Sequence, residues 1–146
     1  MRIHAIPADV VAHARTVTDE HHEHWADAPG SPLRCCLRHS GDGEPVVLFR
    51  YSPGAGRGPY EEEGPVFVHA EACAGPDRTD VLPDELCREP RVLRAYDADG
   101  RIHTGELAAP DEVDTVLAKL LADGQVAEVQ VRSLSHGCFL FAVTRS

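Results

Sequence analysis

The chain has 146 residues, of which 42% are hydrophobic and 26% are charged, a composition typical of a globular domain and not of a disordered chain. Its 24 acidic and 14 basic residues give a formal net charge of −10. This charge repels nucleic-acid phosphates and anionic membrane surfaces, so neither is an expected partner, and the length predicts one domain, 1–146.

Apolar segments long enough to cross a bilayer are missing from the sequence, since no run approaches about 20 apolar residues. The N-terminal stretch also lacks the continuous apolar segment of a signal peptide. We therefore expect a cytoplasmic protein. In that compartment the five cysteines, an odd number, are more consistent with reduced thiols than with disulfides.

The first third of the chain predicts a strand, a helix and a loop. Arg2–Ile6 reads as a short strand, and Pro7 suits the first turn of a helix whose apolar positions repeat up to Val17. Residues 19–32 have no apolar period and contain two prolines, which predicts a loop. The histidines of this loop lack helical spacing, so a solvated polar segment is favoured over a metal site.

Two strands enclose a long glycine-rich connection in the middle of the chain. Val46–Ser52 and Pro65–Glu71 are rich in β-branched and aromatic residues and are bounded by turn residues. The connection Pro53–Gly64 is long for a compact domain and is the best candidate for a lid or binding loop. Its glycines do not match a nucleotide-binding spacing.

The second half predicts two hairpins around one strong helix. Arg91–Leu107 alternates about an Asp/Gly turn, and we expect Arg94 and Tyr96 on its exposed face with His103 as a cross-strand neighbour. A helical turn is expected after Pro83. Pro110–Asp123 repeats apolar residues at helical spacing, ends before Gly124, and should cover the sheet formed by the hairpin of residues 125–145.

Strands outnumber helices, and most are joined by turns. The sequence therefore predicts an α+β fold: one compact domain with a mainly antiparallel sheet, or a half barrel formed by curling that sheet, covered by two helices. Pairing of exposed edge strands would allow a homodimer.

Several of these segments together resemble one known family. They are LRCCLR, GPYEEEGPVFVHAEAC, RAYDADG, the predicted helix and VRSLSHGCF. These motifs are similar to the bacterial domain-of-unknown-function family 1203 over nearly the whole chain. Because no activity is established for that family, the resemblance implies one compact domain and no mechanism.

A cluster of thiols and imidazoles is the sharpest chemical hypothesis. His69 and Cys73 form an H-x3-C pair, His136 and Cys138 an H-x-C pair, and Cys35 and Cys36 are adjacent. Zinc typically takes four such ligands from two closely spaced pairs, whereas adjacent cysteines chelate one ion poorly. Free cysteine is also commonly buried without a function, so the sequence assigns no metal ligands and no cofactor.

The preferred interpretation is a pocket near His69 that binds a small molecule, with an anion among the options. His69 would act as acid or base, with Glu71 or an acid of 61–63 orienting the imidazole. Alternatively, Cys73 or Cys138 would act as a nucleophile if a histidine lowers its pKa. Tyr60 is the third candidate catalytic residue. Tyr96, Arg94 and Arg132 would contact the ligand, since a guanidinium matches a carboxylate or phosphate.

Two alternatives remain open beside the small-molecule pocket. One is a non-catalytic protein-interaction module that uses the glycine-rich loop and a sheet face. The other is the metal-binding protein described above. Whether the chain is an enzyme is left open, because no residue order is specific for one chemistry.

Overall fold

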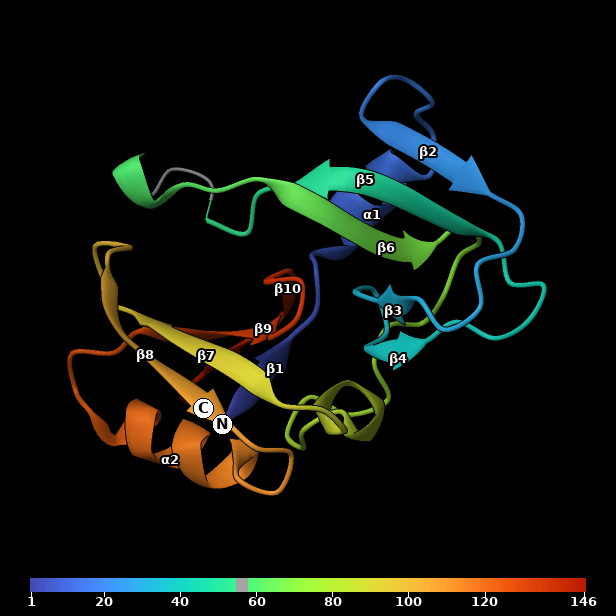
Figure 1. Cartoon of the computed structure of the whole chain (residues 1–146). Helices are drawn as coiled ribbons and strands as arrows, with labels where there is room; N and C mark the ends of the chain where they lie inside the picture. Colours follow the sequence, from blue (N-terminus) through green and yellow to red (C-terminus); the bar gives the residue numbers. More distant parts are fainter. Residues whose placement is uncertain (55–57) are drawn as a thin grey trace.

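The computed structural model describes residues 1–54 and 58–146, which form two five-stranded sheets and two helices (Figure 1). The first sheet has the order β1-β10-β9-β7-β8 and the second the order β2-β5-β6-β3-β4. The prediction of an α+β fold with mainly antiparallel strands is confirmed. The strands separate into two sheets, which the sequence did not reveal.

The first sheet is built from the two predicted hairpins and the N-terminal strand. Its strands are β1 (Arg2–His4), β7 (Arg91–Tyr96), β8 (Ile102–Ala108), β9 (Glu128–Ser133) and β10 (Phe139–Thr144). Helix α2 (Val113–Ala122) lies against it, and Leu117, which is fully buried, packs with Leu93 and Phe141. The helix begins after the predicted Pro110, because residues 110–112 form a turn.

The second sheet contains the two central strands and three short ones. Its strands are β2 (His22–Trp25), β3 (Pro32–Leu33), β4 (Arg38–His39), β5 (Val46–Tyr51) and β6 (Gly64–His69). The pairs are antiparallel except for β3 with β6, which are parallel at Leu33 and Phe67. Helix α1 (Ala8–Ala14) contributes Val11 and Ala14 to the core of this sheet.

The prediction of a loop over residues 19–32 is wrong for β2. Residues His22 to Trp25 pair antiparallel with β5, and the ring of His22 stacks on Phe49 with centroids 5.7 Å apart. Histidine and glutamate at an edge strand leave no apolar alternation. The sequence therefore gave no strand signal there.

The exposed face predicted for the first hairpin is also wrong. Tyr96 is 1% exposed, and Arg94 donates to Tyr96 Oη and to Glu62, which follows the η1 segment (Gly58–Tyr60) in the chain. His103 is not their neighbour: its Nε2 lies 2.9 Å from Asp123 Oδ2, at the end of α2. The strand pairing shifts between Ala95 and Tyr96, from Thr104 to Ile102, and thereby skips His103.

The predicted helical turn after Pro83 is a short 3-10 helix, η2 (Asp84–Cys87), with Leu86 fully buried. Strand β10 connects the two cores, since Phe141 and Val143 belong to the core beneath α2 and Phe139 and Ala142 to the core of the second sheet. In the part of the chain described, no helix has the length and apolar character to cross a bilayer. Residues 55–57 of the predicted binding loop lie outside the described residues.

Candidate functional site

The second sheet brings the turn at Cys35 and Cys36 next to the end of β6. The pairing of β5 with β6 places His69, the last residue of β6, opposite Val46. The parallel pairing of β3 with β6 then sets Leu33 beside Phe67, and the Arg34 N–H donates to the Phe67 carbonyl at 2.8 Å. The residues after Leu33 therefore continue toward the imidazole.

Cys35 and Cys36 lie in the tight turn between β3 and β4. The Leu37 N–H donates to the Leu33 carbonyl at 2.9 Å, and Leu37 has a positive φ of 62°. In such a turn adjacent side chains do not alternate as they do along a strand. This backbone lets both thiols face the same imidazole, which their adjacency in the sequence did not suggest.

Four potential ligand atoms converge at this point. Cys35 Sγ and Cys36 Sγ lie 3.5 and 3.6 Å from His69 Nδ1. With Cys73 Sγ, these atoms all lie within 4.8 Å of one another. Three thiols and one imidazole make up a ligand set that zinc prefers in structural sites.

The spacing of these atoms suits a tetrahedral ion. With Zn–S of about 2.3 Å and Zn–N of about 2.0 Å, a tetrahedral angle separates a sulfur from a nitrogen ligand by about 3.5 Å. The two separations of 3.5 and 3.6 Å match that edge. The other separations among the four atoms are all below 4.8 Å.

A carboxylate fixes the orientation of the imidazole. His69 Nε2 lies 2.7 Å from Glu44 Oε2, and Arg38 donates to both carboxylate oxygens of Glu44 at 3.1 and 3.0 Å. Arg38 Nη2 is also 3.0 Å from Nε2. When the imidazole is neutral, an N–H at Nε2 donates to Glu44, so Nδ1 is the unprotonated nitrogen and faces the thiols.

The pKa of Glu44 reflects these partners. The Arg38 guanidinium, the Gly41 N–H and the His69 ring together hold the pKa of Glu44 at about 2, well below its usual range. Burial opposes ionisation of His69, but its contacts with Cys73 and Glu44 raise its pKa above the ordinary value. An anionic Glu44 is therefore present at neutral pH.

Backbone and arginine donors surround the sulfur atoms. The His69 N–H donates to Cys35 Sγ at 3.3 Å, and Arg15 Nη2 donates to Cys73 Sγ at 3.7 Å. Arg15 Nε also donates to the His69 carbonyl at 2.9 Å. Donors of this kind stabilise thiolates.

The two adjacent thiols have opposite acidities. The hydrogen bond that Cys35 gives to Cys36 raises the pKa of Cys35 and lowers the pKa of Cys36, with burial adding to the effect on Cys35. Cys36 is therefore the first of the pair to ionise. It is also the less buried of the two.

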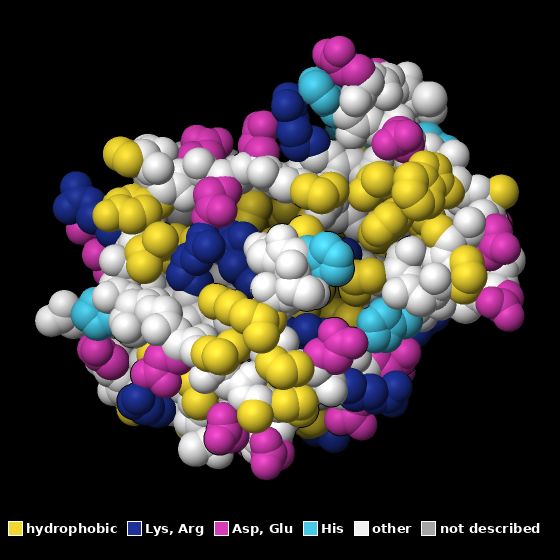
Figure 2. Space-filling view, viewed as in Figure 1, with side chains coloured by type: hydrophobic (Ala, Val, Ile, Leu, Met, Phe, Trp, Pro, Cys, Tyr) yellow, Lys and Arg dark blue, Asp and Glu magenta, His cyan; other side chains and the backbone are white. Residues whose placement is uncertain are grey.

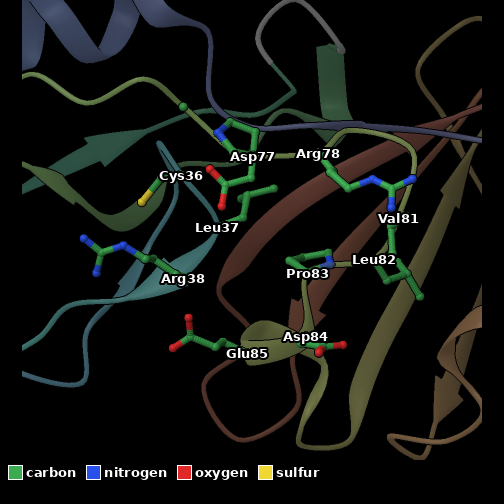
Figure 3. Close-up of a pocket in the computed structure, with 12 residues that line it drawn as sticks. Cys36, Leu37, Arg38, Asp77, Arg78, Val81, Leu82, Pro83, Asp84 and Glu85 are labelled. Carbon is green, nitrogen blue, oxygen red and sulfur yellow. The ribbon is translucent and has the colours of Figure 1, made fainter.

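Two cavities flank the thiol cluster on either side of Gly75 and Pro76. The larger, of about 440 Å³, is lined by Cys36 and Arg38 together with the η2 segment. Figure 3 shows Cys36 and Arg38 on one side of it, Arg78 and Val81 on the other. The second, of about 270 Å³, is bounded by Cys35, Cys73 and Arg15.

The candidates from the sequence fall into two groups. His69 and Cys73 lie together with Cys35 and Cys36. His136 and Cys138 lie at the turn between β9 and β10 and line another cavity.

The candidate ligand-binding residues lie apart from the thiols. Arg94, Tyr96 and Arg132 form a second group with Gln130 and Glu62. Tyr60 and Glu71 are exposed at the surface. Among the described residues, the cavity at Arg132 shares no lining residue with those at the thiols.

Three residues near His69 were missed in the sequence: Glu44, Arg38 and Arg15. Glu44 had a detectable signal, because it lies two residues before the strand that pairs with Pro65–Glu71, and antiparallel pairing brings that end to His69. Arg15 had none, since its approach depends on how α1 packs.

Comparisons with known proteins give one match. Residues 30–145, most of the chain, match the family described as "Protein of unknown function (DUF1203)", as the resemblance predicted. No curated protein and no solved structure matches the chain. All four residues of the thiol cluster lie within the matched range.

Proposed function

The chain belongs to the DUF1203 family of proteins of unknown function, and from its thiol cluster we propose that it is a zinc-binding protein. The zinc ligands would be Cys35, Cys36, His69 and Cys73. The observation that carries this proposal is the convergence of four ligand atoms within 4.8 Å, with the tetrahedral sulfur–nitrogen separations described above.

The chemistry around the four ligands supports a structural ion. Four protein ligands fill a tetrahedral zinc site and leave no position for substrate, which is typical of structural zinc. Three thiolates and Zn²⁺ carry one net negative charge, and Arg15 and Arg38 supply nearby positive charge. Glu44 provides the carboxylate partner that zinc-bound histidines commonly have.

Metal analysis tests this proposal directly. Protein purified without a histidine tag and without chelators should contain close to one zinc ion per molecule, as measured by inductively coupled plasma mass spectrometry. Cys36→Ser and His69→Ala should reduce this content, because each removes a ligand. Cys87→Ser and Cys138→Ser are matched controls, since both thiols lie outside the cluster and should leave zinc content unchanged.

Cobalt gives a second readout that does not depend on purification history. Co²⁺ added to metal-free protein should produce the strong visible bands of tetrahedral thiolate coordination, and Cys36→Ser should weaken them. Less than about a tenth of an equivalent of zinc, iron or copper in the parent chain, together with no cobalt bands, would remove the proposal.

A small-molecule site beside the cluster is the second candidate. The cavity of about 440 Å³ at Cys36 is lined by Asp77, Asp84 and Glu85 as well as by two arginines. A small anion there would contact the guanidinium groups of Arg38 and Arg78 in place of Glu44 and Asp80. Succinate titrated into labelled protein should shift the amide resonances of residues 36–38 and 76–85, and Arg78→Ala should reduce those shifts. Unchanged spectra at millimolar succinate would exclude this ligand class.

Catalytic roles for Tyr60, His69 and Cys73 stay predictions, as does the homodimer. A closed zinc site would occupy His69 and Cys73 as ligands and would leave neither as acid, base or nucleophile. The metal analysis therefore also decides between these roles.

A further inference from the structure

A second polar group lies between the two sheets, away from the thiol cluster. Its members are Arg94 and Tyr96 of β7, Gln130 and Arg132 of β9, and Glu62, which precedes β6. Figure 2 shows basic side chains gathered on this face of the molecule, with acidic and apolar side chains around them.

Arg132 is the unusual member of this group. Only 7% of its side chain is exposed, and a buried guanidinium is costly unless its N–H groups are paired. Its Nη atoms donate to Gln130 Oε1 at 2.6 Å and to the Gly137 carbonyl at 3.2 Å, but its buried Nε has no hydrogen-bond partner. The guanidinium therefore retains an unused donor.

A single carboxylate from the chain itself serves both arginines. Glu62 Oε1 accepts a short hydrogen bond from Arg94 Nη1 and a long one of 3.4 Å from Arg132 Nη2. One oxygen thus contacts both guanidinium groups, whereas an arginine fork is best matched by both oxygens of a carboxylate. Because 44% of the Glu62 side chain is exposed, it can swing into solvent without a change in the core.

The cavity next to these groups has the lining of a site for an organic acid. It measures about 190 Å³, and its lining combines the charged residues Arg132, Glu62 and Glu63 with apolar and aromatic ones, among them Tyr51, Val66 and Phe139. The rings of Tyr51 and Phe139 lie 5.9 Å apart. A charged group beside apolar and aromatic walls is typical of small-molecule pockets.

We propose that this cavity binds a small carboxylic acid with an apolar or aromatic body, whose carboxylate takes the place of the Glu62 side chain on Arg132 and Arg94. Glu62 is then an internal competitor: its carboxylate pairs with the two arginines in the free protein and leaves when the ligand enters. This site goes beyond the zinc proposal and does not depend on it, because no residue is shared between them.

Benzoate is a suitable probe, and its binding can be followed by amide chemical shifts in the full chain. Saturable shifts are expected at Val66, Gly137 and Phe139. Benzamide, which has the same shape without the charge, should bind at least about tenfold more weakly.

Variants of the loop test the competition. Glu62→Gln should bind benzoate at least about fivefold more tightly, because no internal carboxylate then competes with benzoate for the two arginines. Glu61→Gln is the matched control: it makes the same change in net charge at a neighbouring exposed position and should bind as the parent does. Equal benzoate affinity of the two variants would overturn the internal competition.

Variants of the arginines test the site itself. Arg132→Met and the less buried Arg94→Met should each weaken benzoate binding at least about tenfold. If the Arg132→Met variant does not fold, Arg94→Met still tests the site, because the Arg94 side chain is 25% exposed and its loss disturbs the core less. Parent affinity in a folded Arg94→Met or Arg132→Met variant, or equal binding of benzoate and benzamide, contradicts the proposal.

Discussion

At the scale of single residues, Glu44 decides how the imidazole of His69 is presented. It accepts from Nε2 and is itself held by Arg38 and the Gly41 N–H. The free Nδ1 then points to Cys35 and Cys36. The Glu44 carboxylate, in the turn before β5, thus orients the Nδ1 atom of His69 at the end of β6.

Glu44→Gln should weaken zinc binding by about tenfold to a hundredfold. A carboxylate that accepts from the outer N–H of a zinc-bound imidazole raises the basicity of the ring and fixes its tautomer. Competition with a chromogenic chelator measures this affinity. Asp42→Asn, a substitution in the same turn at an exposed residue, is the control and should bind as the parent does. A Glu44→Gln variant of parental affinity would show that the carboxylate plays no part in metal binding.

The carboxylate of Asp123 makes a pH-dependent contribution to stability. The Gln125 N–H, followed by the ring of His103, lowers the pKa of Asp123. A lowered folded-state pKa stabilises the native state above the unfolded value near 3.8 and loses that effect as the pH falls through the folded value.

Asp123→Asn should therefore lower the urea midpoint at pH 7 and should match the parent once the pH lies below both values. Asp111→Asn, at an exposed residue before α2, controls for the change in net charge. A difference between parent and Asp123→Asn that grows on acidification contradicts this assignment.

The sequence revealed the site residues that lie next to a recognisable strand, and not the contacts that depend on strand pairing. His69 stood out because it lies at the end of a clear strand, and Cys73 because it follows that strand closely. Their meeting with Cys35 and Cys36 could not be derived, since it requires the parallel pairing of β3 with β6 and the positive φ of Leu37. Arg94 and Arg132 were noted as anion contacts, and the structure places them in a group apart from His69.

At the scale of elements, helix α2 and the hairpins were predictable because their apolar residues repeat at the period of the element. Strand β2 was not, because its outward residues are polar and its pairing with β5 is the main sign of its presence. The division into two sheets was equally hidden, since periodicity gives the face of a strand and not its partners.

Helix α2 should contribute strongly to stability through Leu117. Its side chain is fully buried against the first sheet, so Leu117→Ala should cost about 2–5 kcal/mol in the free energy of unfolding. Thr115→Ala, on the exposed side of the same helix, should stay within about 0.5 kcal/mol of the parent. Urea denaturation measures both, and equal costs would contradict the packing described for this helix.

At the scale of the whole molecule, the proposed zinc site belongs to the second sheet alone. Its ligands join the β3–β4 turn, the end of β6 and the segment that follows. The core under α2 belongs mainly to the first sheet, although Leu37 of the β3–β4 turn also packs in it. Loss of the ion should therefore loosen one half of the molecule more than the other.

Hydrogen exchange tests this division. Removal of zinc with a chelator should increase exchange at residues 33–40 and 66–73, because binding energy at the ligands stabilises these segments. The amides of β7 and β9, which pair in the middle of the first sheet, should keep their protection. A uniform increase over both sheets would show that the two halves unfold as one unit.

The order of strand pairing along the chain has a consequence for biosynthesis. Every strand of the second sheet, and all four proposed ligands, lie between residues 22 and 73. The first sheet instead joins β1 to β10, so Ile3 meets Val143 only after almost the entire chain has been made. Contacts between distant residues form slowly. The strand pairs of the second sheet therefore need no residue beyond 73, but its core is completed only when Phe139 and Ala142 of β10 have been made.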